Sequence, residues 1–256
     1  MKRIYLTLCL IAAFGISTSK AQDSLEFKPS GKVIARGFLD YSTGFGDVNE
    51  QKGFDITRAF LGYNYKITRN LSAQVIIDGA SGKTSSDKLE VHLRNAAVNW
   101  SDKGLNINAG LTNLMQFSIQ EKYWMHRYVM KSFQDEYKMA PSVDLGATIE
   151  YAFNPFISAD FSLTNGEGYK KVKKDNMRYA AGLSLHPIKN TIFRIYADIY
   201  NDDETLRDAL PSGVTDVNYK DQYTLSLFAG YQDKNVSMGA EYNRVYNKGF
   251  IEKKDF

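Results

Sequence analysis

Apolar and polar residues alternate with period two along most of the chain after residue 30. Between Val143 and Phe153, for example, every odd position is apolar, while the even positions are polar or small. Such alternation predicts β-strands that have one apolar and one polar face. The pattern predicts eleven strands, over residues 31–42, 54–67, 71–78, 88–100, 105–112, 143–153, 157–164, 177–186, 191–200, 219–231 and 235–246.

The lengths of the strands and of their connections predict a fold class. Most of the predicted strands are longer than the five or six residues typical of soluble sheets and match tilted membrane-spanning strands. Short connections at 68–70, 101–103, 154–155, 187–190 and 232–234 alternate with long ones at 43–53, 79–87, 113–142, 165–176 and 201–218. Tight periplasmic turns and longer outer loops produce this order in outer-membrane barrels. We therefore expect an all-β fold, an antiparallel transmembrane β-barrel whose first strand runs outward.

The number of strands raises the question of where the barrel ends. Single-chain bacterial barrels have an even number of strands. Residues 249–256 would make a poor twelfth strand, because Glu252, Lys253, Lys254 and Asp255 interrupt any apolar face. We expect the eleven or twelve strands to belong to a C-terminally truncated part of a longer barrel. The alternative is a small barrel that an irregular last strand closes.

Two predicted strands break the alternation. In the strand at 88–100 the apolar phase shifts near Asn95 and Ala96, and in the strand at 54–67 it shifts after Phe60. An extra residue in one strand of a pair, a β-bulge, produces such a shift.

The N-terminus has the organisation of a signal peptide. Basic Lys2 and Arg3 precede a short apolar run, and Ser19-Lys20-Ala21 supplies the small residues read at a cleavage site. We expect a signal peptide at 1–21 and a barrel domain at 22–256; a buried N-terminal helix is the alternative. Cleavage removes three of the 32 basic residues and leaves 29, against 29 acidic residues. The formal charge of +3 therefore belongs to the targeting segment, and no nucleic-acid partner is expected.

The polar face of the predicted strands is rich in charge. If the apolar face meets lipid, the inner face carries seven basic and eight acidic residues: Lys32, Arg36, Arg58, Lys66, Arg94, Arg178, Arg194, Asp40, Asp78, Glu90, Asp144, Glu150, Asp160, Asp198 and Glu241. A dry core would need every charge paired at high cost, whereas water in a channel screens them. We expect a wet channel. A network of ion pairs in a plugged interior is the alternative.

The segment QFSIQEKYWMHRYVMKSFQDEYKM, residues 116–139, follows neither strand nor simple loop patterning. Its charges spread around a helix instead of along one face, which disfavours a helix lying on the membrane surface. We expect a long loop folded into the barrel, with Phe117, Trp124 and Tyr128 packed on the inner wall and the charges facing the pore. The residues expected to form the constriction and set selectivity are Arg58, Arg94, Glu121, Lys122, Arg127 and Lys131.

Catalytic and cofactor chemistry finds little support in the chain. The three histidines do not have the spacing of a zinc site, and no serine nucleophile with a neighbouring base is readable. No enzymatic activity, metal or cofactor is expected. The run KKVKK, from Lys170 to Lys174, lies in a predicted outer loop, and we expect it to be simply solvated. Attraction of anions or lipopolysaccharide phosphates is the alternative.

Two stretches carry a resemblance to a known family. FDITRAFLGYNY, around Arg58, and NAGLTNLMQFSIQEKYWMHRYVMKSF, with Gly110, Phe117, Ser118, Ile119 and Arg127, resemble the phosphate-selective porin O/P family of bacterial outer membranes. The resemblance implies a barrel of 16 strands, longer than this chain supplies, and anions such as phosphate among the solutes. Porins of this kind are often trimers, so a homotrimer is the expected assembly.

These patterns together predict a porin in the outer membrane of a Gram-negative cell, in contact with lipid and lipopolysaccharide. It would allow passive diffusion of small hydrophilic solutes or ions through a water-filled barrel. Two alternatives remain. A non-conducting barrel acting as an adhesin or structural anchor would have a plugged lumen. An outer-membrane hydrolase would need a catalytic pair on one rim, which the sequence does not reveal.

Overall fold

The structure is a computed structural model that describes residues 27–43, 53–81, 89–170, 176–201, 220–252 and 255. The predicted signal peptide at 1–21 lies outside the described residues. The same is true of positions 171–174 in the KKVKK run and of 253, 254 and 256 in the tail.

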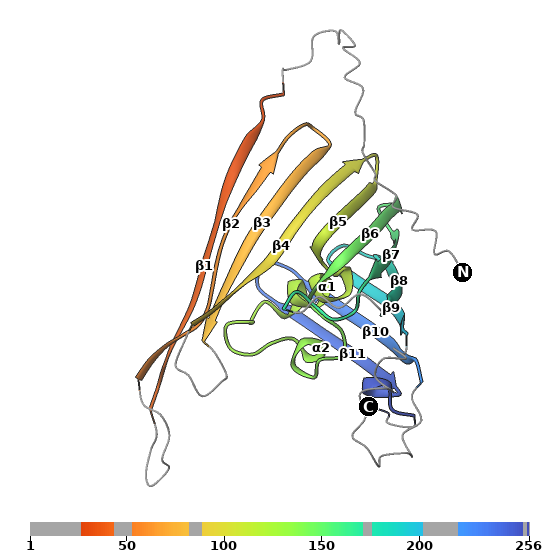
Figure 1. Ribbon diagram of the computed structural model, residues 1–256. Helices are drawn as coiled ribbons and strands as arrows, with labels where there is room; N and C mark the ends of the chain where they lie inside the picture. The colour runs from red at the N-terminus through yellow and green to blue at the C-terminus, as the bar shows by residue number, and fades with distance from the viewer. Residues whose placement is uncertain are drawn as a thin grey trace, which may run out of the picture.

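Eleven strands form one antiparallel sheet in which each strand pairs with its neighbours in sequence (Figure 1). All eleven strands predicted from the alternation are confirmed. Their bounds are β1 Ser30–Ser42, β2 Gly53–Lys66, β3 Leu71–Ser81, β4 Leu89–Asp102, β5 Leu105–Asn113, β6 Val143–Asn154, β7 Ile157–Thr164, β8 Arg178–Leu185, β9 Thr191–Tyr200, β10 Gln222–Gln232 and β11 Ser237–Tyr246.

The sheet is strongly curved, and the helices between β5 and β6 lie on its concave side (Figure 1). Within the described residues no strand pairs with the outer edge of β1 or β11, so the sheet is not closed. A curved antiparallel meander is the arrangement from which up-and-down barrels are built. A closed barrel and a count of 16 strands stay predictions.

The polarity of the sheet is reversed relative to a soluble protein. Along β8 the residues Arg178, Ala180, Gly182 and Ser184 are buried, while the alternate positions are exposed. The same exchange occurs on β9 and β10, where Arg194, Asp198 and Ser226 are buried and Phe193, Ile195 and Leu225 are exposed. Because the helices lie over the polar face, the polar residues point inward and the large apolar side chains outward.

Aromatic side chains lie on the outward face near several strand ends. Tyr63 and Tyr65 are stacked, with ring centroids 6.2 Å apart, and both are exposed. Tyr151 and Phe153, at the end of β6, have centroids 5.0 Å apart. Rings at these places are typical of the aromatic girdles that border the apolar band of membrane barrels.

The predicted order of short and long connections is confirmed by the strand bounds. Local chemistry explains the tight turns. Lys103 and Gly104 both have positive φ, which suits a two-residue hairpin. The side-chain oxygens of Asn154 and Asp233 each accept two backbone N–H groups from the residues that follow, at 2.8–3.0 Å. Such side-chain caps replace backbone hydrogen bonds and fix a turn.

One of the two predicted bulges is confirmed at its place and the other is displaced. The pairing of β3 with β4 skips Arg94, next to the predicted position at Asn95. In β2 the register shifts at Thr57 instead of after Phe60. The ring of Phe60 lies under the guanidinium groups of Arg58 and Arg94, on the inner face. Because Phe60 points inward, the alternation in the sequence shifts only after residue 60, although the bulge in the backbone lies at Thr57.

Two short helices occupy the connection between β5 and β6. They are α1, Met115–Trp124, and α2, Phe133–Glu136, and a 3₁₀ turn, η1, Lys248–Phe250, follows β11. Within the part of the chain that the structure describes, no helix is a candidate for crossing a membrane.

Candidate functional site

The first half of the 114–142 segment runs along the inner face of β9, β10 and β11. Gln116 accepts a hydrogen bond from the Arg194 Nε at 2.7 Å, and Gln120 donates one to Glu241 at 2.5 Å. Tyr123 packs edge-on against Phe228 of β10, with ring centroids 5.5 Å apart. At the end of α1 the hydroxyl of Ser237, at the start of β11, donates to the Tyr123 carbonyl. Helix α1 therefore spans the inner wall from its middle to the tight-turn end.

The second half returns along the same wall. Gln134 of α2 donates to the Ser226 hydroxyl at 2.6 Å, and Lys248 donates to the Tyr137 carbonyl at 3.0 Å. The expectation that Trp124 and Tyr128 pack on the wall is wrong, because these side chains are 36% and 68% exposed. The inner wall presents hydroxyl, amide and charged groups, so the segment contacts it mainly through glutamines.

Arg127 holds the turn between the two halves together. Its guanidinium contacts Glu121 at 2.9 Å and Asp135 at 2.8 Å, and it lies over the Phe117 ring at 5.3 Å. One cation thereby connects α1 to α2. Lys131 and Glu136 make a looser contact nearby, at 3.7 Å.

A second segment, residues 165–170, also folds against the inner side. Asp144 is fully buried at the start of β6 and accepts the backbone N–H groups of Gly166 at 2.5 Å and Gly168 at 3.2 Å. Both glycines have φ of +85°. A Cβ on Gly166 would lie 2.2 Å from the Tyr200 ring, so only glycine fits there.

Tyr169 links this second segment to the opposite wall. Its hydroxyl donates to Asp78 of β3 at 2.5 Å and accepts from Arg58 of β2 at 2.5 Å. Arg58 and Asp78 are themselves joined by a 2.5 Å ion pair. Burial and the hydrogen bond to the Asp78 carboxylate raise the pKa of Tyr169 to about 12, so the phenol stays protonated and can donate. The bridge connects parts of the chain 91 residues apart.

The two inward segments, the strands β1 to β4 and the strands β8 to β10 line a cavity of about 800 Å³, the charged cavity. It lies toward the long connections, because its strand residues stand at the ends of β2, β8, β9 and β10 that lead to them. Its charged lining has six basic residues, Arg58, Arg127, Lys131, Lys138, Lys170 and Arg178, and three acidic ones, Glu90, Asp135 and Glu167. Asp78, Glu121 and Asp198 pair with Arg58, Arg127 and Arg178 from outside this lining. The lysines therefore supply the cationic charge that favours anions inside the cavity.

Three of the six predicted constriction residues line the charged cavity: Arg58, Arg127 and Lys131. Arg94 lies beside them, over the same Phe60 ring as Arg58, and Glu121 reaches the cavity through its contact with Arg127. Lys122 lies apart. It lines a separate hollow with Phe156, Lys189 and Gln232, at the tight-turn end.

Part of the inner wall is held by buried ion pairs. Arg178 of β8 contacts Asp198 of β9 at 2.8 Å, and Arg194 of β9 contacts Asp160 of β7 at 2.6 Å. The arginine side chains are almost wholly buried. The wall at these pairs is therefore drier than the predicted wet interior and agrees there with the alternative of an ion-pair network. Arg58 and Lys131 remain partly accessible in the charged cavity.

Sequence reasoning missed the inward fold of residues 165–170, with Asp144 as its anchor and Tyr169 as its bridge. Asp144 was visible only as one inner charge among many. The Asn165-Gly166-Glu167-Gly168 sequence carries the signal of a tightly turned loop. Nothing in it tells which way the loop folds.

Within the described residues no three His, Cys, Asp or Glu side chains gather as a metal site. No protein-family model matches this chain, and no curated protein matches its sequence. The resemblance to the phosphate-selective porin O/P family therefore stays a prediction from the two stretches that carry it.

Proposed function

We propose that this chain forms an outer-membrane porin through which small hydrophilic solutes and ions diffuse passively. The observation that carries the proposal is the reversed polarity of the sheet. Exposed apolar side chains cover its outward face, while arginines, aspartates and amides point inward. A contiguous apolar surface of this extent is unfavourable in water and favourable in lipid. Export would depend on the predicted signal peptide at 1–21.

The charged cavity supports a role in choosing what enters. It lies toward the long connections, which are the outer loops in the predicted orientation, and its lining has more basic than acidic groups. Ions in a narrow aqueous passage respond to such fixed charges. Anions, including phosphate, are therefore the favoured ions among the solutes that we propose.

The conductance of single channels in planar bilayers tests the proposal. The full chain, refolded and inserted, should give discrete steps whose current is proportional to voltage. Insertion is monitored independently, by protease protection in vesicles. A protein that inserts and is protected but gives no conductance would rule the porin out.

A non-conducting adhesin or structural anchor is the second candidate. It is supported by the buried Arg178–Asp198 and Arg194–Asp160 ion pairs and by the Tyr169 bridge, which fill space on the concave side. The two candidates differ in their response to loosening of the 114–142 segment. Arg127→Met should increase the current of a porin, whereas an anchor would stay closed and lose only stability.

A further inference from the structure

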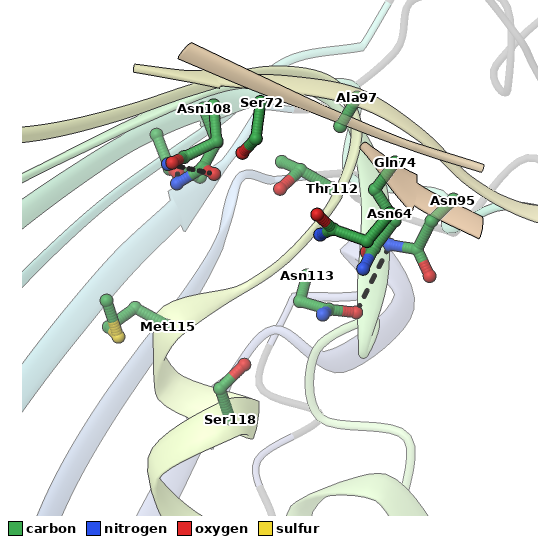
Figure 2. Close-up of a pocket in the computed structure, with 12 residues that line it drawn as sticks. Asn64, Ser72, Gln74, Asn95, Ala97, Asn108, Thr112, Asn113, Met115 and Ser118 are labelled. Carbon is green, nitrogen blue, oxygen red and sulfur yellow. Dashed lines mark hydrogen bonds between the residues drawn. The ribbon is translucent and has the colours of Figure 1, made fainter. Parts of the chain in front are cut away.

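A second hollow lies in the inner wall, away from the charged cavity (Figure 2). It has a volume of about 300 Å³ and is formed by β2 to β6 together with the start of α1. Its lining residues are Asn64, Ser72, Gln74, Asn95, Ala97, Asn99, Asn108, Thr112, Asn113, Met115, Ser118 and Thr148. No ionisable side chain lines it, but the Arg94 guanidinium donates to the side-chain oxygens of two lining residues, Asn95 at 2.7 Å and Asn113 at 3.1 Å. We call it the amide hollow.

The pairing of the strands explains why the wall is hollow here. Ala97, Gly110 and Gly146 pair directly across β4, β5 and β6 and form a row almost without side chains. A Cβ on Gly110 would lie 2.3 Å from the Ala96 oxygen, and one on Gly146 would lie 2.1 Å from the Leu163 oxygen. Neither position tolerates a side chain, so the depression is built into the backbone.

A row of polar side chains follows on the tight-turn side of this depression. Ser72, Asn99, Asn108 and Thr148 pair in register across four strands, β3 to β6. Asn99 donates to Asn108 at 2.9 Å, and Asn108 donates to Thr148 at 3.2 Å. These bonds hold Asn99, Asn108 and Thr148 in a fixed orientation, and Ser72 lies beside them without one within the described residues.

Some polar groups around the hollow are free to bind and others are not. Asn64, Gln74, Asn95 and Asn113 gather on one side of it (Figure 2). Asn95 and Asn113 are already bonded, to each other at 3.3 Å and to Arg94. The side chains of Asn64, Ser72 and Gln74 make no hydrogen bond to another residue that the structure describes. Each amide offers both a donor and an acceptor at close spacing.

This chemistry distinguishes neutral from cationic solutes. A hydroxyl both donates and accepts, so several hydroxyls on one ring exchange their bonds to water for bonds to amides at little net cost. A cation entering the hollow loses part of its hydration, finds no carboxylate among the lining residues and is repelled by the Arg94 guanidinium beside them. Pockets that bind small molecules begin at about this volume, so the solute is no larger than a small sugar.

We propose that the amide hollow binds uncharged polyhydroxylated solutes of the size of a monosaccharide. This names a solute class for the porin proposed above and rests on that proposal for the solute's route, while binding itself needs only the folded wall. The charged cavity and the amide hollow then act on different solutes within one lumen.

Binding of D-glucose to the full chain in detergent micelles tests the proposal, with protonated D-glucosamine as a cationic probe of similar size. Saturation-transfer NMR should show glucose binding in the millimolar range and at least about tenfold weaker binding of protonated glucosamine, the loss expected when a cation is desolvated beside Arg94 without an acidic partner. Ala97→Trp fills the depression and should weaken glucose binding by about tenfold or more.

Two variants control the measurement. Ala152→Trp places the same ring on the inner face of β6 outside the hollow, and it should leave glucose binding unchanged. Gln74→Glu keeps the shape of its side chain and puts a charge at the rim. It should weaken glucose binding several-fold, even if Ala97→Trp does not fold.

The outcomes separate this inference from the porin proposal. Equal binding of glucose and protonated glucosamine, no glucose binding, or equal effects of the tryptophan variants at 97 and 152 would each overturn the amide hollow as a sugar site. If the chain binds glucose as expected but gives no conductance, the sugar site is supported and the porin proposal is wrong. If the chain conducts but binds no glucose, the porin proposal is supported and the sugar site is wrong.

Discussion

The charged cavity and the amide hollow share one concave face and differ in how their side chains are held. In the charged cavity Arg58, Asp78 and Tyr169 bond to one another and join two walls. In the amide hollow Asn64 and Gln74 have no side-chain partner within the described residues. The charges cluster toward the long connections, and the amides lie nearer the tight turns.

Solvation explains this difference. A buried charge without a partner costs several kcal/mol, so charged side chains that are partly shielded from water are drawn into pairs and networks. A free amide facing a water-filled space costs little, because water bonds to it. The charged end is therefore the stiff one, and the neutral end keeps unused donors and acceptors.

Asp78→Ala should have the largest effect on stability. The carboxylate is 1% exposed and receives both Arg58 and Tyr169, so its loss leaves a shielded guanidinium unpaired. We expect the free energy of unfolding to fall by about 3 kcal/mol. Urea unfolding in lipid vesicles, followed by the fluorescence of the two tryptophans, measures it.

Asn108→Ala is the matched change in the amide hollow. It removes one donor to Thr148 and one acceptor of Asn99 and should cost about 1 kcal/mol. If the two variants lost equal stability, the distinction between a stiff charged end and a loosely held neutral end would be wrong.

Arg127→Met should loosen the inward segment. The substitution removes the contacts to Glu121 and Asp135 but keeps much of the packing on Phe117. We expect a loss of about 2 kcal/mol in the free energy of unfolding and a larger, noisier single-channel current. Lys122→Met serves as the control, because Lys122 lies outside the charged cavity. An unchanged current from Arg127→Met would mean that the segment does not restrict the passage.

Much of the fold could be predicted from the sequence because it follows from a local rule. Apolar outward residues alternate with polar inward residues along each strand, so the sequence alone shows which face is which. Leu183, for example, is exposed and its neighbour Ser184 is buried, as their polarity predicts. Bulge positions are less readable. The shift at Thr57 was misplaced because Phe60 is an inward aromatic whose partners, Arg58 and Arg94, lie on two different strands.

The sites were harder to predict because they depend on contacts distant in sequence. The inward course of 114–142 was inferred from its composition, but its glutamine contacts depend on Arg194, Glu241 and Ser226, about 80 to 120 residues away. The amide hollow depends on register. Asn99 and Asn108 each lie at a polar position of an alternating stretch, yet only the pairing of β4 with β5 places them side by side.

Tyr169→Phe should have a smaller effect that depends on pH. The variant loses the hydroxyl that bonds to Asp78 and Arg58 and should be about 1 kcal/mol less stable at neutral pH. Because the pKa of Tyr169 is raised to about 12, above its usual value near 10, its contribution is fully present below about pH 10 and is lost as the pH rises through 12.

Absorbance at 295 nm monitors this ionisation directly. The difference between the titration curves of the parent chain and Tyr169→Phe should contain one phenol that ionises near pH 12. A difference centred near pH 10 would show that Tyr169 does not form the bridge in solution.

The smallest expected effect is on ion selectivity, measured together with glucose binding to compare the charged cavity with the amide hollow. Lys138 lines the charged cavity and makes no ion pair within the described residues. Reversing its charge with Lys138→Glu should lower the anion-to-cation permeability ratio about threefold in dilute salt and less at high ionic strength. Lys138→Gln, which removes one charge instead of reversing it, should give about half this change on a logarithmic scale. Reversal potentials in salt gradients measure all of these ratios.

Asn64→Asp is the counterpart in the amide hollow. It adds a single negative charge on β2 and should shift the permeability ratio about as much as Lys138→Gln. The effect on glucose binding distinguishes the two regions. Asn64→Asp should weaken glucose binding several-fold, because the carboxylate has lost the amide donor, whereas Lys138→Glu should leave glucose binding unchanged. Equal effects of the two variants on glucose binding would mean that one place in the lumen acts on both ions and sugars. The contrast between the charged cavity and the amide hollow would then have no functional meaning.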